Sequence, residues 1–119
     1  MKLRINITKE IIKKAMWCNT SNGPFPIASN CAIAVAVRDI FPMAAVGPLD
    51  IFLGFIGIKD VYLPLEAQNF IYEFDKLWIS PKKRLELDPI SFEIDIPEEV
   101  ISMINIEDIH KSETLELVP

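Results

Sequence analysis

The chain has 119 residues, of which 50% are hydrophobic and 24% charged, and its formal net charge is −5 at pH 7. This length suits one domain with its own core, and the hydrophobic content argues against intrinsic disorder. The negative charge argues against nucleic acid as the main partner, because phosphates attract basic surfaces. Every apolar run is shorter than the roughly 18 residues that span a bilayer, so we expect a cytoplasmic protein with no membrane partner.

The first elements are predicted to be a strand and a helix. Residues 2–7 alternate between polar and apolar side chains, which is the period of a half-buried strand. Thr8 suits a helix N-cap, because its hydroxyl can accept a hydrogen bond from a free N–H group of the first turn. The helix is predicted over residues 9–17, and residues 18–28 are predicted as a loop because they are rich in asparagine, glycine and proline.

The most apolar helix is predicted over residues 30–41, with Ser29 or Asn30 as its N-cap and Pro42 as its stop. Its first charged residue is Arg38, and alanines fill the faces between the larger side chains. A helix that is apolar nearly all round is buried on more than one side, so we expect the other segments to pack against it. A buried strand is the alternative for such a short run, and the helix preference of alanine favours the helix.

The next segment is the richest in apolar residues. Residues 43–49 are predicted as a short strand that ends in a turn, and residues 61–63 as another strand. Between them, residues 50–58 form either one buried strand bent at a glycine or two short strands of a hairpin. One small sheet does not need this many apolar residues, so residues 49–58 are expected in a central strand or in a homodimer interface. The surplus residues are Ile51, Phe52, Phe55, Ile56 and Ile58.

The second half of the chain has clearer periodicity. An amphipathic helix is predicted over residues 63–77, with Pro64 at its start. Its buried stripe consists of Ala67, Phe70, Ile71, Phe74 and Leu77. Residues 78–84 end in three consecutive cations and are predicted to be a solvated connector. Residues 89–96 alternate without a fault, as a strand does, and residues 97–104 begin with proline and two acids, as a short helix does.

These elements predict an α+β fold, a single small domain in which a mostly antiparallel or mixed β-sheet packs against two or three helices. Residues 1–104 form this domain, and residues 105–119 are an acidic and apolar C-terminal tail that docks on the body or on a partner. The start of the chain is basic and its C-terminal third is acidic. We expect the two ends to lie close together and partly neutralise each other; the alternative is an acidic surface for a basic partner.

Three stretches resemble a set of short, uncharacterised bacterial and phage proteins: residues 30–38, residues 63–75 and the strand that begins at Pro89. That family has a strand, a loop, a C-P-[IV]-A-x-A helix, a β segment, an L-P-x-x-A-x-x-F-I-x-x-F-D helix and a final P-F-x-F strand. The resemblance covers residues 3–96 and departs at Ala32, where the family has proline. It implies a small α/β fold and a phage or mobile-element context, and it implies no activity.

No catalytic motif of the G-x-S-x-G or H-E-x-x-H type and no phosphate-binding loop is present. Cys18, Cys31 and His110 are too few for a zinc site of four ligands, so we expect no metal and no cofactor. Whether Cys18 and Cys31 pair stays open, although a reducing cytosol favours thiols. A nucleophilic Cys31 would require His110 as its base, and a small buried thiol is the simpler interpretation. We therefore expect no enzyme activity.

We interpret the chain as a non-enzymatic binding protein that acts through protein–protein interaction, as a phage inhibitor of a host protein does. We expect a homodimer and an unidentified protein partner. The predicted interaction surface consists of Glu98, Glu99, Glu107, Asp108, Phe52 and Phe55. The alternative is a small-molecule binder, in which the loop of residues 18–30 and the following helix start hold an anionic ligand through Ser29, Asn30 and Cys31.

Overall fold

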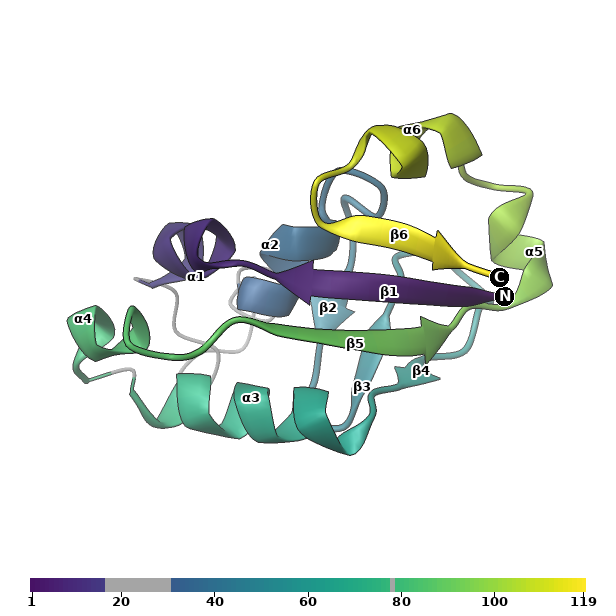
Figure 1. Ribbon diagram of the computed structural model, residues 1–119. Coiled ribbons are helices and arrows are strands. Elements are labelled where there is room, and N and C mark those ends of the chain that lie inside the picture. Colours follow the sequence, from purple (N-terminus) through teal and green to yellow (C-terminus); the bar gives the residue numbers. More distant parts are fainter. Residues whose placement is uncertain (17–30, 78) are drawn as a thin grey trace.

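The computed structural model describes residues 1–16, 31–77 and 79–119, which form an α+β fold with two small antiparallel sheets (Figure 1). The predicted fold class is confirmed, with two three-stranded sheets where we expected one. No helix in these ranges is long and apolar enough to cross a bilayer. In chain order the elements are β1 (Lys2–Ile7), α1 (Lys9–Ala15), α2 (Ala32–Val37), β2 (Ala45–Val46), β3 (Asp50–Phe52), β4 (Val61–Tyr62), α3 (Leu65–Lys76), α4 (Pro81–Arg84), β5 (Ile90–Asp95), α5 (Glu98–Ile101), α6 (Ile106–Lys111) and β6 (Leu115–Val118).

The first sheet has the strand order β5–β1–β6, and both pairs are antiparallel. The alternation predicted for β1 and β5 is confirmed, because Leu3 and Ile5 are buried opposite Ile94 and Phe92. Helix α2 packs against β1, and α3 runs beside β5 (Figure 1). Four of the five residues in the stripe predicted for α3 lie in the core, whereas Leu77 follows the helix as its C-cap and is half-buried. The four buried residues are Ala67, Phe70, Ile71 and Phe74.

The other face of the first sheet carries charges that pair between strands. Arg4 Nη2 lies 3.1 Å from Glu93 Oε2, and Arg4 Nη1 lies 3.7 Å from Glu116 Oε2. Lys2 stands opposite Asp95 in the register, and the two ends of the chain lie side by side (Figure 1). The predicted meeting of the basic start and the acidic end of the chain is therefore confirmed.

The second sheet has the strand order β2–β3–β4, and its central strand is shorter than predicted. Strand β3 ends at Phe52, so neither alternative for residues 50–58 is correct. The chain leaves the sheet at Gly54 and Gly57, whose φ angles of +96° and +86° suit glycine because it has no Cβ. β3 and β4 then form the hairpin, across the loop that joins them.

The central helix is also shorter than predicted. α2 ends at Val37, where Arg38 and Asp39 lead the chain to the surface, four residues before the expected end. Its N-cap is Cys31, whose Sγ accepts a hydrogen bond from the Ala34 N–H group at 3.5 Å. The prediction of Ser29 or Asn30 as the N-cap is wrong for the helix as observed, because the helix begins later.

Residues 105–119, which the sequence describes as a tail, form α6 and β6. β6 pairs with β1 along the first sheet, and both Leu115 and Ile109 belong to the buried core. Thr114 Oγ1 donates a hydrogen bond to the Ala36 carbonyl at 2.6 Å. The C-terminal segment is thereby joined to the C-terminal turn of α2.

The predicted solvated connector is wrong at Arg84, although Lys82 and Lys83 are exposed as expected. Arg84 ends the short helix α4 and is only 1% exposed. It is buried because its guanidinium group finds carbonyl partners and an aromatic ring inside the fold, at the ends of α1 and α3.

Candidate functional site

Large apolar side chains are exposed on and around the second sheet. Ile56 is 99% exposed in the loop between β3 and β4, and Tyr62 on β4 is 79% exposed. Met43 and Leu49, in the connections before β2 and β3, are exposed as well. Together with the half-buried Phe52 on β3, these residues form what we call the second-sheet surface.

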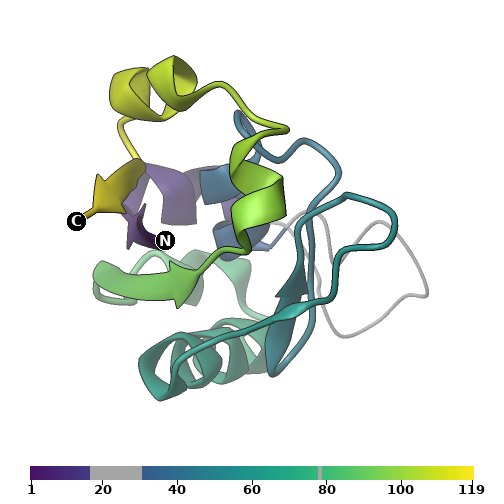
Figure 2. The same cartoon turned by 90° about the vertical axis from the view of Figure 1, so that its right-hand side faces the viewer.

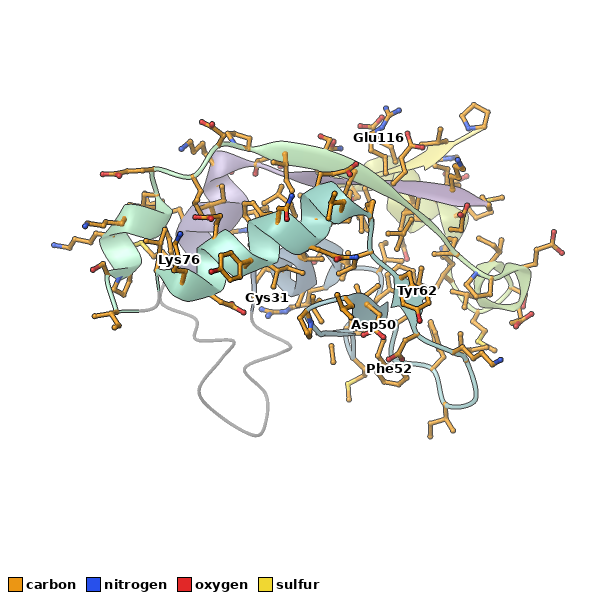
Figure 3. The ribbon with its side chains drawn as sticks, turned by 90° about the horizontal axis from the view of Figure 1, so that it is seen from below. Cys31, Asp50, Phe52, Tyr62, Lys76 and Glu116 are labelled. Carbon is orange, nitrogen blue, oxygen red and sulfur yellow. The ribbon has the colours of Figure 1, made fainter. Side chains whose placement is uncertain are left out.

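The period and register of the strands explain why Phe52 and Tyr62 share one face of the second sheet. Ile51 is completely buried and points to the core, so its neighbours Asp50 and Phe52 point the opposite way. Asp50 pairs with Tyr62 in the register, and residues that pair across two strands point to the same face. Figure 3 shows Asp50, Phe52 and Tyr62 gathered on this side of the molecule.

The loop that carries Ile56 lies against Met43. A Cβ atom placed on Gly54 would come within 2.8 Å of Met43 Cβ, so the backbone at Gly54 touches the chain before β2. Phe55 turns the other way, and its ring meets Phe41 edge to face with the centroids 6.2 Å apart. The loop therefore presents Ile56 to the solvent while Phe55 packs on the core.

The structure separates the predicted interaction residues. Phe52 belongs to the second-sheet surface, whereas Phe55 is half-buried against the core. The acidic residues are all exposed, and α5 lies between α6 and the loop that joins β3 to β4 (Figure 2). These acidic residues are Glu98 and Glu99 on α5 and Glu107 and Asp108 on α6.

Exposure divides the surplus apolar residues that the sequence indicated. Ile51 is fully buried and Ile58 is partly buried against the core, whereas Ile56 is exposed. The residues missed from the sequence are Met43, Leu49 and Tyr62. In the sequence these three residues were marked only by their place in the same apolar segment. A sequence pattern does not tell which face of a short strand is buried by the rest of the fold.

The alternative ligand site is only partly within the described ranges. Ser29 and Asn30 lie outside them, so the prediction of an anionic ligand at those residues stays a prediction. Cys31 is buried and borders a cavity of about 10 Å³ whose other walls include Phe70, Phe74 and Asp75. That volume is close to the size of one water molecule and far below that of a ligand pocket.

The carboxyl group of Asp75 makes this cavity wall unfavourable for an anion. Burial raises the pKa of Asp75 above 3.8, and the nearby Arg84 guanidinium partly opposes the rise. Within residues 1–16, 31–77 and 79–119, Asp75 Oδ1 is buried without a hydrogen-bond partner. Among the described residues, Cys31 therefore shares this cavity with a carboxyl group.

The same described ranges contain no group of three His, Cys, Asp or Glu side chains that could hold a metal ion. Comparisons with protein families, with curated proteins and with solved structures found no match to this chain.

Proposed function

We propose that the protein is a cytoplasmic, non-enzymatic binding protein that acts through protein–protein contact, and that a second copy of the chain covers the second-sheet surface. The observation that supports this most is the exposure of Ile56 and Tyr62, at 99% and 79%, beside Met43 and Leu49. Apolar surface left in water costs about 25 cal/mol for each Å². A partner that covers this surface gains that free energy, and contiguous exposed apolar patches commonly mark interfaces.

The charges around the surface favour a second copy as the occupant. A two-fold symmetric interface brings the same patch of both copies together, so the patch has to complement itself. Exposed Lys59 and Asp60 follow Ile56 in the loop, and Asp50 shares the face of Tyr62. Two copies can therefore place Lys59 of one chain opposite an aspartate of the other, whereas a patch of one sign would repel its copy.

The strands at the edges of the second sheet support face-to-face contact. β2 and β4 contain two residues each, so they offer few backbone groups for pairing with another strand. The side chains on the face of the sheet offer more surface for contact than the backbone groups at its edges do. We therefore place the contact on the face of the sheet and not on its edge.

The resemblance to short bacterial and phage proteins implies a phage or mobile-element context. In that context we propose that the dimer inhibits a host protein. The acidic residues of α5 and α6 are exposed and do not belong to the second-sheet surface, which supports a basic surface on that partner.

Analytical ultracentrifugation of two matched tyrosine variants tests the dimer. We expect the wild type at micromolar concentration to have twice the chain mass of 13.5 kDa. Tyr62→Ser should raise the dissociation constant about tenfold or more, because a buried aromatic residue at an interface is often worth over 1.4 kcal/mol. Tyr72→Ser is the control, since Tyr72 lies on α3 and is 66% exposed.

Circular dichroism checks that both variants fold. A wild type with the mass of one chain at every concentration would contradict the proposed dimer. A dimer weakened by Tyr72→Ser and unaffected by Tyr62→Ser would place the interface elsewhere.

A further inference from the structure

A groove of about 520 Å³ shares no lining residue with the second-sheet surface. Its walls come from residues 8–14, residues 35–39 and residues 111–114, which belong to α1, the end of α2 and the connection from α6 to β6. We call it the polar groove. These segments are distant in the sequence and meet at the side of the molecule where α1 approaches the α6–β6 connection (Figure 1).

Three basic and three acidic side chains line the polar groove. Within residues 1–16, 31–77 and 79–119, no ion pair within 4 Å involves Lys14, Lys111 or any of the three carboxylates. The lining charges are Lys14, Arg38, Lys111, Glu10, Asp39 and Glu113. The two lysines and the three carboxylates thus share one groove without pairing with each other, which leaves both signs available to a bound molecule.

The floor of the groove is held by hydroxyl groups with fixed roles. Thr114 Oγ1 uses its only proton for the Ala36 carbonyl, so the Ser112 hydroxyl, 3.3 Å away, has to be the donor between these two side chains. Ser112 Oγ also accepts from the Thr114 and Leu115 N–H groups, at 3.2 and 3.1 Å. This network orders the groove before a ligand arrives, which lowers the entropy cost of binding.

Thr8 adds a donor at the other wall. Its Oγ1 accepts a hydrogen bond from the Ile11 N–H group at 3.2 Å, as an N-cap does. The Thr8 hydroxyl proton is not used in that bond, so it can be donated to a ligand oxygen. The groove therefore combines a neutral donor with cations and carboxylates.

We propose that the polar groove binds a small zwitterion, a molecule such as a free amino acid or short peptide that carries both an ammonium and a carboxylate group. A purely anionic ligand would be attracted by the lysines and repelled by the three carboxylates, whereas a zwitterion meets both signs. The volume lies within the range of roughly 300–1,000 Å³ that is usual for small-ligand sites. This site goes beyond the proposed protein binding, because none of its residues belongs to the second-sheet surface.

Nuclear magnetic resonance titration of the ¹⁵N-labelled protein tests the groove. The probes are the common free amino acids and glycylglycine, with acetate as an anion and ethylammonium as a cation for comparison. We expect at least one zwitterion to shift the amide signals of Thr8, Val35 and Thr114 saturably, and to bind more tightly than either single-charge probe. Equal or tighter binding of acetate would overturn the zwitterion assignment, and so would the absence of saturable shifts with every zwitterion.

Two charge variants locate the site. Lys111→Met and Glu113→Gln should each weaken the zwitterion about tenfold, because a hydrogen bond to a charged group is worth roughly 1.5–3 kcal/mol. Lys82→Met is the matched control, since Lys82 is an exposed lysine on α4 outside the groove. Unchanged affinity in both groove variants would overturn the placement of the ligand in the polar groove.

Discussion

The guanidinium group of Arg84 lies 3.9 Å from the centre of the Phe74 ring. Its Nε donates a hydrogen bond to the Phe74 carbonyl at 2.8 Å, and its Nη1 donates to the Met16 carbonyl at 3.1 Å. Met16 is the C-cap of α1 and Phe74 lies in the last turn of α3, and a cation is favoured near the C-terminal end of a helix. Arg84 thereby joins the ends of α1 and α3 across the core.

Lys9, at the start of α1, makes a second set of contacts between α1 and the segment that contains α4. Lys9 Nζ donates hydrogen bonds to the carbonyls of Leu85 and Leu87, at 2.7 and 2.6 Å. The first residue of α1 is therefore bonded to the turn that follows α4, and Arg84 at the end of α4 is bonded to the C-terminal end of α1. The two contacts fix the position of α1, which forms one wall of the polar groove.

Arg84→Met is expected to lower the free energy of unfolding by about 3 kcal/mol, because it leaves two buried carbonyls without a charged donor. The methionine keeps part of the contact with the Phe74 ring. Urea denaturation measures the change. Lys83→Met, one residue earlier and exposed, is the control and should change stability by less than about 0.5 kcal/mol. Equal effects of the two variants would show that the Arg84 contacts contribute nothing beyond one surface charge.

Asp75→Asn is expected to stabilise the protein at pH 7 and to lose this advantage as the pH falls. Burial raises the pKa of Asp75 in the folded state above its ordinary 3.8, despite the opposing effect of Arg84. Folding therefore favours the protonated carboxyl, and the cost of the ionised form is present above the folded pKa and absent below 3.8. The asparagine of the variant carries no charge at pH 7 or below pH 3.8, so the variant does not have this cost.

Urea denaturation at pH 7 and below pH 3.8 measures this difference. Asp60→Asn controls for the loss of one exposed negative charge. The Asp75→Asn gain over the wild type should be larger at pH 7 than in acid. A gain that grows as the pH falls would contradict the direction of the pKa shift.

Gly54→Ala and Gly57→Ala are expected to differ in cost, although both glycines have positive φ. A Cβ at Gly54 would meet Met43 Cβ at 2.8 Å and the Met43 carbonyl carbon at 2.9 Å, whereas no described atom lies within 4 Å of one at Gly57. We expect Gly57→Ala to cost about 1 kcal/mol, for the backbone conformation alone. Gly54→Ala should cost about 2–3 kcal/mol, because overpacking is added.

Thermal or urea unfolding of both alanine variants gives the comparison directly. Equal costs would mean that the loop between β3 and β4 moves away from Met43 at little expense. In that case Ile56 and Met43 would not be held together in the second-sheet surface.

Local patterns in the sequence determined the elements whose signal lies within a few residues. The alternation in β1 and β5 and the Thr8 cap appear as predicted, and so do four of the five residues in the apolar stripe of α3. These features depend on side-chain period and on hydrogen bonds between near neighbours. The α+β class follows from them.

Only the tertiary structure decided what those elements cover. Arg84 belongs to a cationic triplet typical of a solvated turn, and it is buried because the ends of α1 and α3 supply carbonyls and a ring. The surplus of apolar residues became core at Ile51 and surface at Ile56. Burial depends on which segments meet across long distances in the chain, and the polar groove, built from three such segments, exists only after they have met.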